Sequence, residues 1–232
     1  MSVHQRIAIT GASGLIGTAL VGHLKAEGHT VQRLVRRAPV GADEVQWDPQ
    51  TGFVDLEPLR GVDAVIHLAG VGVGDKRWSK KYKSEILNSR LLGTTAIANA
   101  VTELKPQVFI SASAIGWYGE SGNRAVVETD RVGDDFLAAV CREWEAAADL
   151  AQDVRTVKIR TGLVLDPTGG ALGKMLPLFR LGLGGKLGNG KQWWSWITLH
   201  DQLRAIIFAL ENPISGPVNL TAPNPVTNQE FT

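Results

Sequence analysis

RIAITGASGLIG, residues 6–17, places a strand-forming run directly before a glycine-rich turn and the start of a helix. In such a turn Gly11 permits the sharp exit from the strand, Gly14 lets backbone N–H groups approach a pyrophosphate, and Gly17 allows close helix–strand packing. The helix that follows presents unpaired N–H groups and a positive dipole end to an anion. In this context the G-x-x-G-x-x-G spacing predicts a dinucleotide-binding loop rather than a glycine turn without a ligand. Its other expected contacts are Ser13, Leu15 and Ile16.

The order of elements around this loop predicts an α/β protein. Short β-rich runs alternate with longer helical patterns, which is typical of a Rossmann-type doubly wound parallel sheet. Strands are expected at 6–10, 31–35, 64–68, 108–112 and 154–160, and helices at 15–27, 79–104, 135–151 and 201–211. We therefore expect a cofactor-binding Rossmann domain over residues 1–160.

From Thr161 the composition changes, because residues 162–190 contain nine glycines and are followed by the aromatic cluster QWWSWI. We expect residues 161–232 to form a small substrate lobe integrated with the first domain. The last residues read as a strand and the opening of a helix that the chain does not complete, so we expect this lobe to be cut short.

Three arginines near the end of the second strand indicate which dinucleotide binds. NAD sites place an acidic residue there, about 20 residues beyond the loop, to bind the ribose hydroxyls. Residues 28–41 contain no acid, but they do contain Arg33, Arg36 and Arg37. A guanidinium group suits a phosphate, so Arg36 and Arg37 favour NADP over NAD. The alternative is a solvated basic turn.

The amino-acid composition argues against several other classes of protein. With 24 basic and 23 acidic residues, the chain lacks the excess of positive charge that nucleic-acid binding requires. Cys141 is the one cysteine, so neither a disulfide nor a cysteine-based zinc site is expected. No apolar run approaches the length of a membrane span and no signal peptide is evident. We expect a cytoplasmic protein with a small-molecule substrate and no metal, and leave a homodimer open.

Further motifs resemble a known family. The glycine spacing, VIHLAG (65–70) and ISAS (110–113) are similar to the extended short-chain dehydrogenase/reductase superfamily. FLAAVCREWEAAA (136–148), IRTGLVLDPTGGALG (159–173) and LGKMLPLFRLGLGGKLGNGKQWWSWI (172–197) resemble one atypical branch, the NAD(P)-dependent epimerase-like proteins called YfcH-like. The resemblance covers essentially the whole chain, and related proteins continue beyond the position of Thr232.

This resemblance implies further cofactor contacts. Leu68 and Ala69 would line the adenosine ribose, and Arg36 would meet the 2′-phosphate. Glu85 and Arg90 match residues that approach the cofactor from the long helix, although a solvated helix surface is the alternative. Val164 matches a residue whose backbone contacts the cofactor near the nicotinamide.

The resemblance to the superfamily does not extend to two of its usual catalytic residues. The superfamily uses a serine, a tyrosine and a lysine four residues after the tyrosine, because the lysine lowers a phenol pKa that is normally near ~10. Ser113 occupies the serine position. Leu137 and Cys141 stand where the tyrosine and lysine should be, and the branch also lacks this pair. Tyr118 is the candidate substitute, with a stacking wall as its alternative role.

Other polar or aromatic candidates have structural alternatives. Cys141 would be a nucleophile only if its pKa were lowered, and otherwise belongs to the core. His67 is expected to be a core histidine, and His200 a capping or packing residue. The aromatic cluster has two possible roles: its side chains could stack on a substrate, or they could form a hydrophobic layer that joins the two lobes. It consists of Trp193, Trp194 and Trp196.

Two functions follow from these residues. The first is an NADP(H)-dependent oxidoreductase or epimerase-like enzyme that transfers hydride to or from a small carbonyl or sugar-like substrate. The second is a non-catalytic NADP(H)-binding sensor or interaction protein.

Overall fold

Eight strands form one mostly parallel sheet in the computed structural model, which describes residues 4–232. Every neighbouring pair is parallel except β3–β4, which is antiparallel. Across the sheet the strands are β11 (Gly216–Leu220), β7 (Arg155–Thr161), β6 (Val108–Ala114), β5 (Ala64–His67), β1 (Arg6–Thr10), β2 (Thr30–Val35), β3 (Glu44–Asp48) and β4 (Phe53–Val54).

This strand order defines a doubly wound Rossmann sheet, as predicted. The chain builds outward from β1 to β4, then returns to the other side of β1 and builds outward from β5 to β11. The switch point therefore lies between β1 and β5. Ligands of such sheets bind in the crevice beyond the carboxyl ends of the strands at this point.

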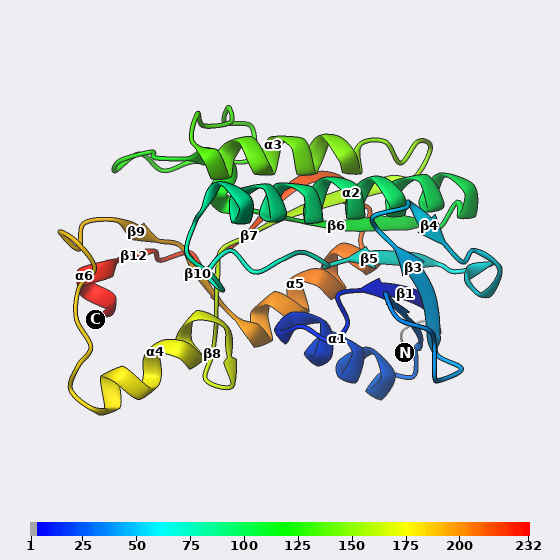
Figure 1. The fold of residues 1–232 in the computed structure, drawn as a ribbon, viewed down its shortest axis with the longest axis horizontal. Helices are drawn as coiled ribbons and strands as arrows, with labels where there is room; N and C mark the ends of the chain where they lie inside the picture. Colours follow the sequence, from blue (N-terminus) through cyan, green and yellow to red (C-terminus); the bar gives the residue numbers. More distant parts are fainter. Residues whose placement is uncertain (1–3) are drawn as a thin grey trace.

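Helices cover both faces of the sheet (Figure 1). Helices α1 (Leu15–Ala26) and α5 (Leu199–Glu211) pack together on one face, and α2 (Lys80–Leu104) and α3 (Phe136–Ala148) on the other. Side chains alternate along each strand, so successive residues enter two separate cores. Ile7 and Ile9 pack with α1 and α5, whereas Ala8 packs with the core beneath α2. The 3₁₀ turns are η1 (Glu57–Leu59) and η2 (Ile115–Tyr118).

Side-chain caps set the starts of three of these helices. Ser79 accepts a hydrogen bond from the backbone of Tyr82, Asp135 from Ala138, and Thr198 from Asp201. Such caps satisfy N–H groups that the helix itself leaves unpaired. Helix α1 differs, because it begins after Gly14 with no side-chain cap.

The C-terminal part of the chain forms a small lobe and also completes the sheet. The lobe, at the left of Figure 1, contains α4 (Gly170–Arg180), the parallel pair β8 (Leu163–Asp166) and β10 (Trp196–Thr198), the antiparallel pair β9 (Trp193–Trp194) and β12 (Val226–Thr227), and α6 (Asn228–Phe231). Both β11 and α5 follow Thr161 in sequence, yet they belong to the Rossmann sheet and its helical layer.

The expected strands and helices of the first 160 residues are present, with ends shifted by a few residues, and the expected helix at 201–211 is present as α5. The additional strands β3 and β4 and most of the lobe elements were not predicted. Within residues 4–232, no helix combines the length and the apolar composition needed to cross a bilayer.

Candidate functional site

The glycine loop lies at the switch point, and its backbone leaves no room for side chains at two positions. Gly11 has φ +68°, and a Cβ there would lie 2.7 Å from the carbonyl carbon of Leu68. A Cβ on Gly17 would lie 2.1 Å from the carbonyl oxygen of Gly11. A Cβ on Gly14 would meet only that same oxygen, at 3.4 Å. The loop is therefore folded tightly on itself and against β5, and Gly14 leaves an open backbone surface.

The start of α1 completes an anion-binding geometry. Because no side chain caps this helix, the N–H groups of its first turn, at Leu15, Ile16 and Gly17, face the loop without a capping acceptor. Unpaired N–H groups and the helix dipole together favour a phosphate at this position. Side chains at Gly11 and Gly17 would collide with the backbone of residues 11, 12, 68 and 69, so the glycines allow the tight loop that a dinucleotide pyrophosphate requires.

Thr10, which sequence reasoning did not single out, joins the carboxyl ends of β1 and β5. Its buried Oγ1 accepts hydrogen bonds from the amides of Leu68 at 3.2 Å and Ala69 at 3.3 Å. Thr10 Oγ1 is also 2.7 Å from Nδ1 of His67. These contacts fix the two residues expected to line the adenosine ribose directly beside Gly11.

His67 is a core histidine, as expected. Complete burial lowers the pKa of its imidazole to about 3, so the ring is neutral at physiological pH. Thr10 already accepts two amide protons, so its hydroxyl proton is directed at Nδ1 and the ring hydrogen remains on Nε2. Within the described residues Nε2 has no hydrogen-bond partner, and it lies against Gly93.

The three arginines in and directly after β2 have different surroundings. Arg33 binds both carboxylate oxygens of Asp43, at 2.9 and 3.1 Å, and Arg37 binds both oxygens of Glu44 at 2.7 Å. The hydrogen bond from Arg37 is the largest contribution that lowers the pKa of Glu44 to about 2. Arg36 is exposed and forms no ion pair with any residue of 4–232. Arg36 is therefore the arginine free to bind a 2′-phosphate, whereas the guanidinium of Arg37 is already engaged.

The two candidate contacts on α2 also differ. Arg90 is only 8% exposed, and its Nη1 donates to the carbonyl oxygen of Val71, in the segment after β5, at 3.0 Å and to that of Ile86, on α2 itself, at 3.1 Å. No carboxylate in the described chain pairs with it, and burial lowers the pKa of its guanidinium. Glu85 is half-buried, and its carboxylate lies 3.6 Å from Lys76 Nζ. A buried cation without a counter-ion beside the switch point fits an anionic ligand.

The lobe lies against the glycine loop. A Cβ on Gly170, at the start of α4, would lie 3.1 Å from Leu15 Cδ2 and 3.6 Å from the carbonyl oxygen of Val164. Val164 is thus brought close to the loop. Its backbone contact near the nicotinamide stays a prediction. Farther along α4, Lys174 Nζ binds Asp75 Oδ1 at 3.0 Å and connects the lobe to the segment between β5 and α2.

Ser113 and Tyr118, the two catalytic candidates, belong to one buried polar network. Ser113 Oγ donates to Glu145 Oε1 at 2.7 Å, and Arg160 binds both oxygens of Glu145 at 2.8 and 3.0 Å. Arg160 Nη1 also donates to the Tyr118 hydroxyl at 3.0 Å, and this hydroxyl donates to Asn219 Oδ1 at 2.6 Å. The hydroxyl protons of Ser113 and Tyr118 both point at protein acceptors. Proton transfer from either hydroxyl to a substrate would first require one of these bonds to break.

The tyrosine and lysine positions on α3 carry no acid–base group. A Cβ on Gly116 would lie 3.3 Å from Leu137 Cβ and 3.5 Å from Cys141 Sγ, so both side chains pack against η2. Burial, followed by the nearby charge of Glu145, raises the pKa of the Cys141 thiol to about 12. Cys141 is therefore a core residue, and its nucleophile alternative is wrong.

The tryptophan cluster makes contacts within the lobe and with the first domain. Trp193 Nε1 donates to Asn123 Oδ1 at 2.9 Å, and the ring of Trp194 packs on Phe231 with centroids 4.8 Å apart. Trp196 Nε1 donates to the carbonyl oxygen of Asn224 at 3.1 Å. These contacts support the interpretation that the tryptophans pack between the two lobes rather than stack on a substrate. His200 is exposed at the start of α5, within the first turn that Thr198 caps.

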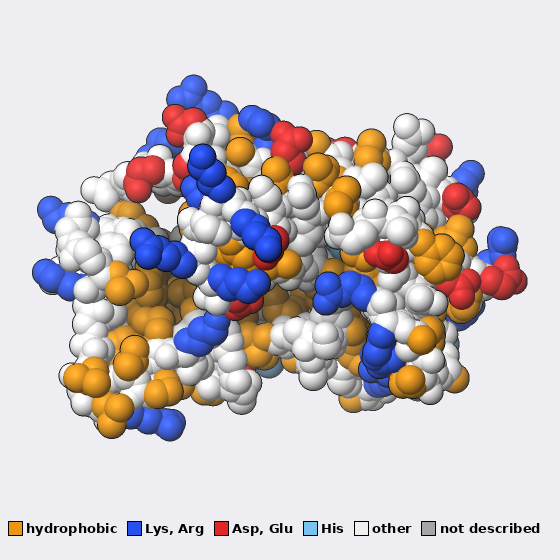
Figure 2. Space-filling view, in the orientation of Figure 1, with side chains coloured by type: hydrophobic (Ala, Val, Ile, Leu, Met, Phe, Trp, Pro, Cys, Tyr) orange, Lys and Arg blue, Asp and Glu red, His pale blue; other side chains and the backbone are white. Residues whose placement is uncertain are grey.

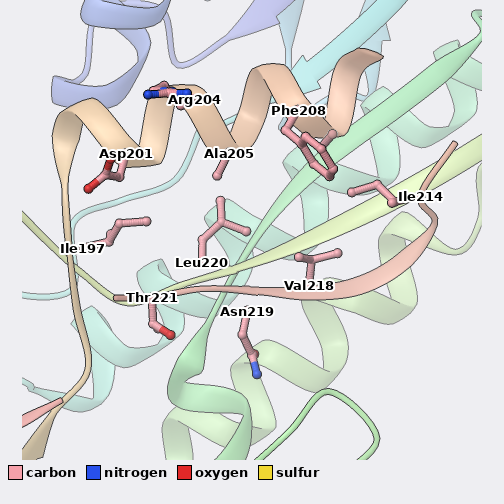
Figure 3. Close-up of a pocket in the computed structure, with 11 residues that line it drawn as sticks. Ile197, Asp201, Arg204, Ala205, Phe208, Ile214, Val218, Asn219, Leu220 and Thr221 are labelled. Carbon is pink, nitrogen blue, oxygen red and sulfur yellow. The ribbon is translucent and has the colours of Figure 1, made fainter. Parts of the chain in front are cut away.

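A groove of about 650 Å³ lies elsewhere, between α5 and the edge strand β11 (Figure 3). Its lining is mainly apolar and includes Ile197, Ala205, Phe208, Val218 and Leu220. Three strands of the sheet separate β11, at the edge, from β1, which precedes the glycine loop. No cluster of metal-ligating side chains occurs in the part of the chain that the structure describes.

Comparison with known proteins agrees with this geometry. The model of the NAD dependent epimerase/dehydratase family matches residues 7–221. An epimerase family protein of Mycobacterium bovis is 48% identical over 229 residues, which cover 97% of this chain and 76% of the relative. The human epimerase family protein SDR39U1 is 38% identical, with 98% of this chain and 78% of the relative covered.

Two solved structures are similar to this chain. The crystal structure of human SDR39U1 with NADPH has a TM-score of 0.87 at 36% identity and covers 97% of this chain and 77% of its own. A nucleoside-diphosphate sugar epimerase of Corynebacterium glutamicum has a TM-score of 0.86 at 41% identity; this chain spans about half of it (49%), with 99% of this chain covered. From the family match and the mycobacterial and human relatives, this chain belongs to the NAD dependent epimerase/dehydratase family.

Proposed function

We propose that this protein binds NADP(H) and acts as an oxidoreductase on a small carbonyl or sugar-like substrate. The observation that carries the proposal is the glycine cradle at the switch point, together with the free guanidinium of Arg36 beyond β2. The NADPH in the crystal structure of human SDR39U1 supports the choice of cofactor.

The chain's own groups have distinct tasks in this proposal. The N–H groups at the start of α1 hold the pyrophosphate, Arg36 holds the 2′-phosphate, and Leu68 and Ala69 line the adenosine side. Arg90 supplies a buried positive charge on the other side of the switch point. Helix α4 and the segment between β5 and α2 enclose the crevice and exclude water. NADPH, when bound, supplies the hydride.

The cofactor step is tested by titrating the protein with NADPH and with NADH, following the fluorescence of the reduced nicotinamide. NADPH is expected to bind more tightly than NADH. Equal affinities would contradict the assignment of Arg36. The catalytic step is tested by incubating the NADPH complex with a panel of aldehydes, ketones and oxidised sugars and following absorbance at 340 nm.

A second function, a non-catalytic NADP(H)-binding sensor, is favoured by a separate observation. The positions of the usual tyrosine and lysine hold Leu137 and Cys141, and the hydroxyls of Ser113 and Tyr118 are engaged in the network around Glu145 and Arg160. Tight NADPH binding without any loss of 340 nm absorbance across the panel would support this function and contradict the first.

A further inference from the structure

The connection between β2 and β3, residues 36–43, begins with the arginine that is proposed to bind the 2′-phosphate. We call it the β2–β3 loop. Parallel strands are usually joined by a dozen or more residues that include a helix. This loop is shorter and contains neither helix nor strand, so no regular hydrogen-bond pattern sets its conformation. Figure 2 shows Lys and Arg side chains, with Asp and Glu side chains near them, over the end of the molecule that contains β2 and β3.

One buried carboxylate, that of Glu44 at the start of β3, holds the β2–β3 loop. Its Oε2 accepts a hydrogen bond from the backbone N–H of Val40 at 2.9 Å, and each of its oxygens accepts one from Arg37 at 2.7 Å. Its Oε1 also lies 3.2 Å from Arg33 Nη2, on β2. The Glu44 backbone N–H donates to the carbonyl oxygen of Gly41 at 3.0 Å. With a side chain only 2% exposed, Glu44 thus ties both β2 and the loop to the start of β3.

The pairing of Arg37 fixes the backbone on one side of Arg36. Besides Glu44, Arg37 Nη1 reaches the carbonyl oxygen of Ala38 at 2.9 Å. On the other side of Arg36, Val35 pairs with β3 in the sheet. Arg36 itself pairs with no carboxylate of residues 4–232, so its guanidinium extends from a backbone that is held at both neighbours. An arginine on a fixed backbone loses less freedom when it binds a phosphate than one on an unrestrained loop.

We propose that Glu44 is a positioning residue that gives Arg36 its selectivity for the 2′-phosphate, and so gives the protein its preference for NADP(H). Glu44 acts through Arg36, because its own carboxylate is turned toward Arg37, Arg33 and Val40. This inference rests on the proposed NADP(H) site and adds the residue that sets its cofactor preference. A simple charge argument predicts the reverse effect, since a carboxylate near a phosphate opposes its binding. The two accounts therefore predict opposite signs when the carboxylate is removed.

Glu44→Gln tests the inference, because it removes the charge and keeps the shape of the side chain. NADPH and NADH affinities are measured by fluorescence titration for the wild type and each variant. Glu44→Gln should weaken NADPH binding by about three- to tenfold, the cost of ordering one long side chain on binding, and should leave NADH binding within about twofold. The control, Asp43→Asn, removes the same charge one residue away. Its carboxylate pairs with Arg33 and Lys25 instead of the loop, so it should keep the wild-type ratio of affinities.

A double-mutant cycle shows whether Glu44 acts through Arg36. In the Arg36→Ala background, adding Glu44→Gln should leave the ratio of NADPH to NADH affinity unchanged, because the side chain to be positioned is absent. Glu44→Asp is a second variant, which keeps the charge but withdraws the carboxylate by one methylene group. It should also lower the ratio, whereas a charge effect would leave the ratio at its wild-type value. Should Glu44→Gln fail to fold in a urea titration, Glu44→Asp carries the same cycle.

Four results would overturn the inference. Tighter NADPH binding by Glu44→Gln would show that the carboxylate acts through its charge. Equal weakening of NADPH and NADH would show a general loss of domain stability. A wild-type ratio in both Glu44 variants would show that Glu44 does not influence cofactor preference. An effect that persists in full in the Arg36→Ala background would show that Glu44 does not act through Arg36. Wild-type protein that binds NADPH no more tightly than NADH would instead refute the proposed cofactor site, so the two failures are distinguishable.

Discussion

Replacing Arg36 by alanine should weaken NADPH binding and leave NADH binding nearly unchanged. Arg36 forms no ion pair with another described residue, so its removal costs the free protein little. A hydrogen bond between charged groups contributes roughly 1.5–3 kcal/mol. Arg36 is exposed to solvent and salt, so we expect the lower part of that range, about 1.5–2 kcal/mol. At about 1.4 kcal/mol for each tenfold change, this predicts a loss of NADPH affinity of about 10- to 30-fold.

Arg37→Ala is the matched control. Its guanidinium binds both oxygens of Glu44, so its removal should affect that pair and change the ratio of NADPH to NADH affinity by less than Arg36→Ala does. Both ratios are obtained by fluorescence titration of the two reduced cofactors, at low and at physiological salt. The reasoning would be refuted if Arg36→Ala weakened NADPH and NADH equally, or if Arg37→Ala changed the ratio more than Arg36→Ala.

Three further predictions follow from the packing. Gly17→Ala should abolish NADPH binding in a titration, because its Cβ would lie 2.1 Å from a carbonyl oxygen of the loop; Gly22→Ala, in the same helix with nothing within 4 Å, should bind as wild type. Glu145→Ala should lower the free energy of unfolding in urea by about 3–5 kcal/mol, because it leaves Arg160 as an uncompensated buried charge; a loss below about 1 kcal/mol would contradict this. Burial raises the pKa of Cys141 from 9.0 to about 12, so its contribution to stability is present below pH 9 and is lost as the pH rises from 9 toward 12. The thiol should therefore resist iodoacetamide at pH 8 until the protein unfolds, and rapid labelling of folded protein would contradict its placement.

Several features of the site were predictable because their signals are local in sequence. The run from Arg6 to Gly17 specifies strand, turn and helix within twelve residues, and the structure shows that Gly11 and Gly17 have no space for a side chain. Ser79 and Asp135 cap their helices where the residue types predicted a helix start.

Other features could not be predicted because they depend on partners distant in sequence or on adjacent strands. The ion pairs of Arg33 and Arg37 form because the register of β2 and β3 places Glu44 opposite Arg33, and β3 has no strong sequence signal. The network that holds Tyr118 joins residues separated by as many as 101 positions. Ser113 and Tyr118 remain candidate catalytic residues by resemblance.

The sequence by itself determined that a dinucleotide loop opens a doubly wound sheet, because turn chemistry and hydrophobic periodicity act over a few residues. Only the tertiary structure decided which arginine is free and which hydroxyls are already hydrogen-bonded. Charge and hydrogen-bond pairing depend on distances of a few ångströms between elements, and these distances exist only once β1 and β5 have diverged and the lobe lies over the crevice between them.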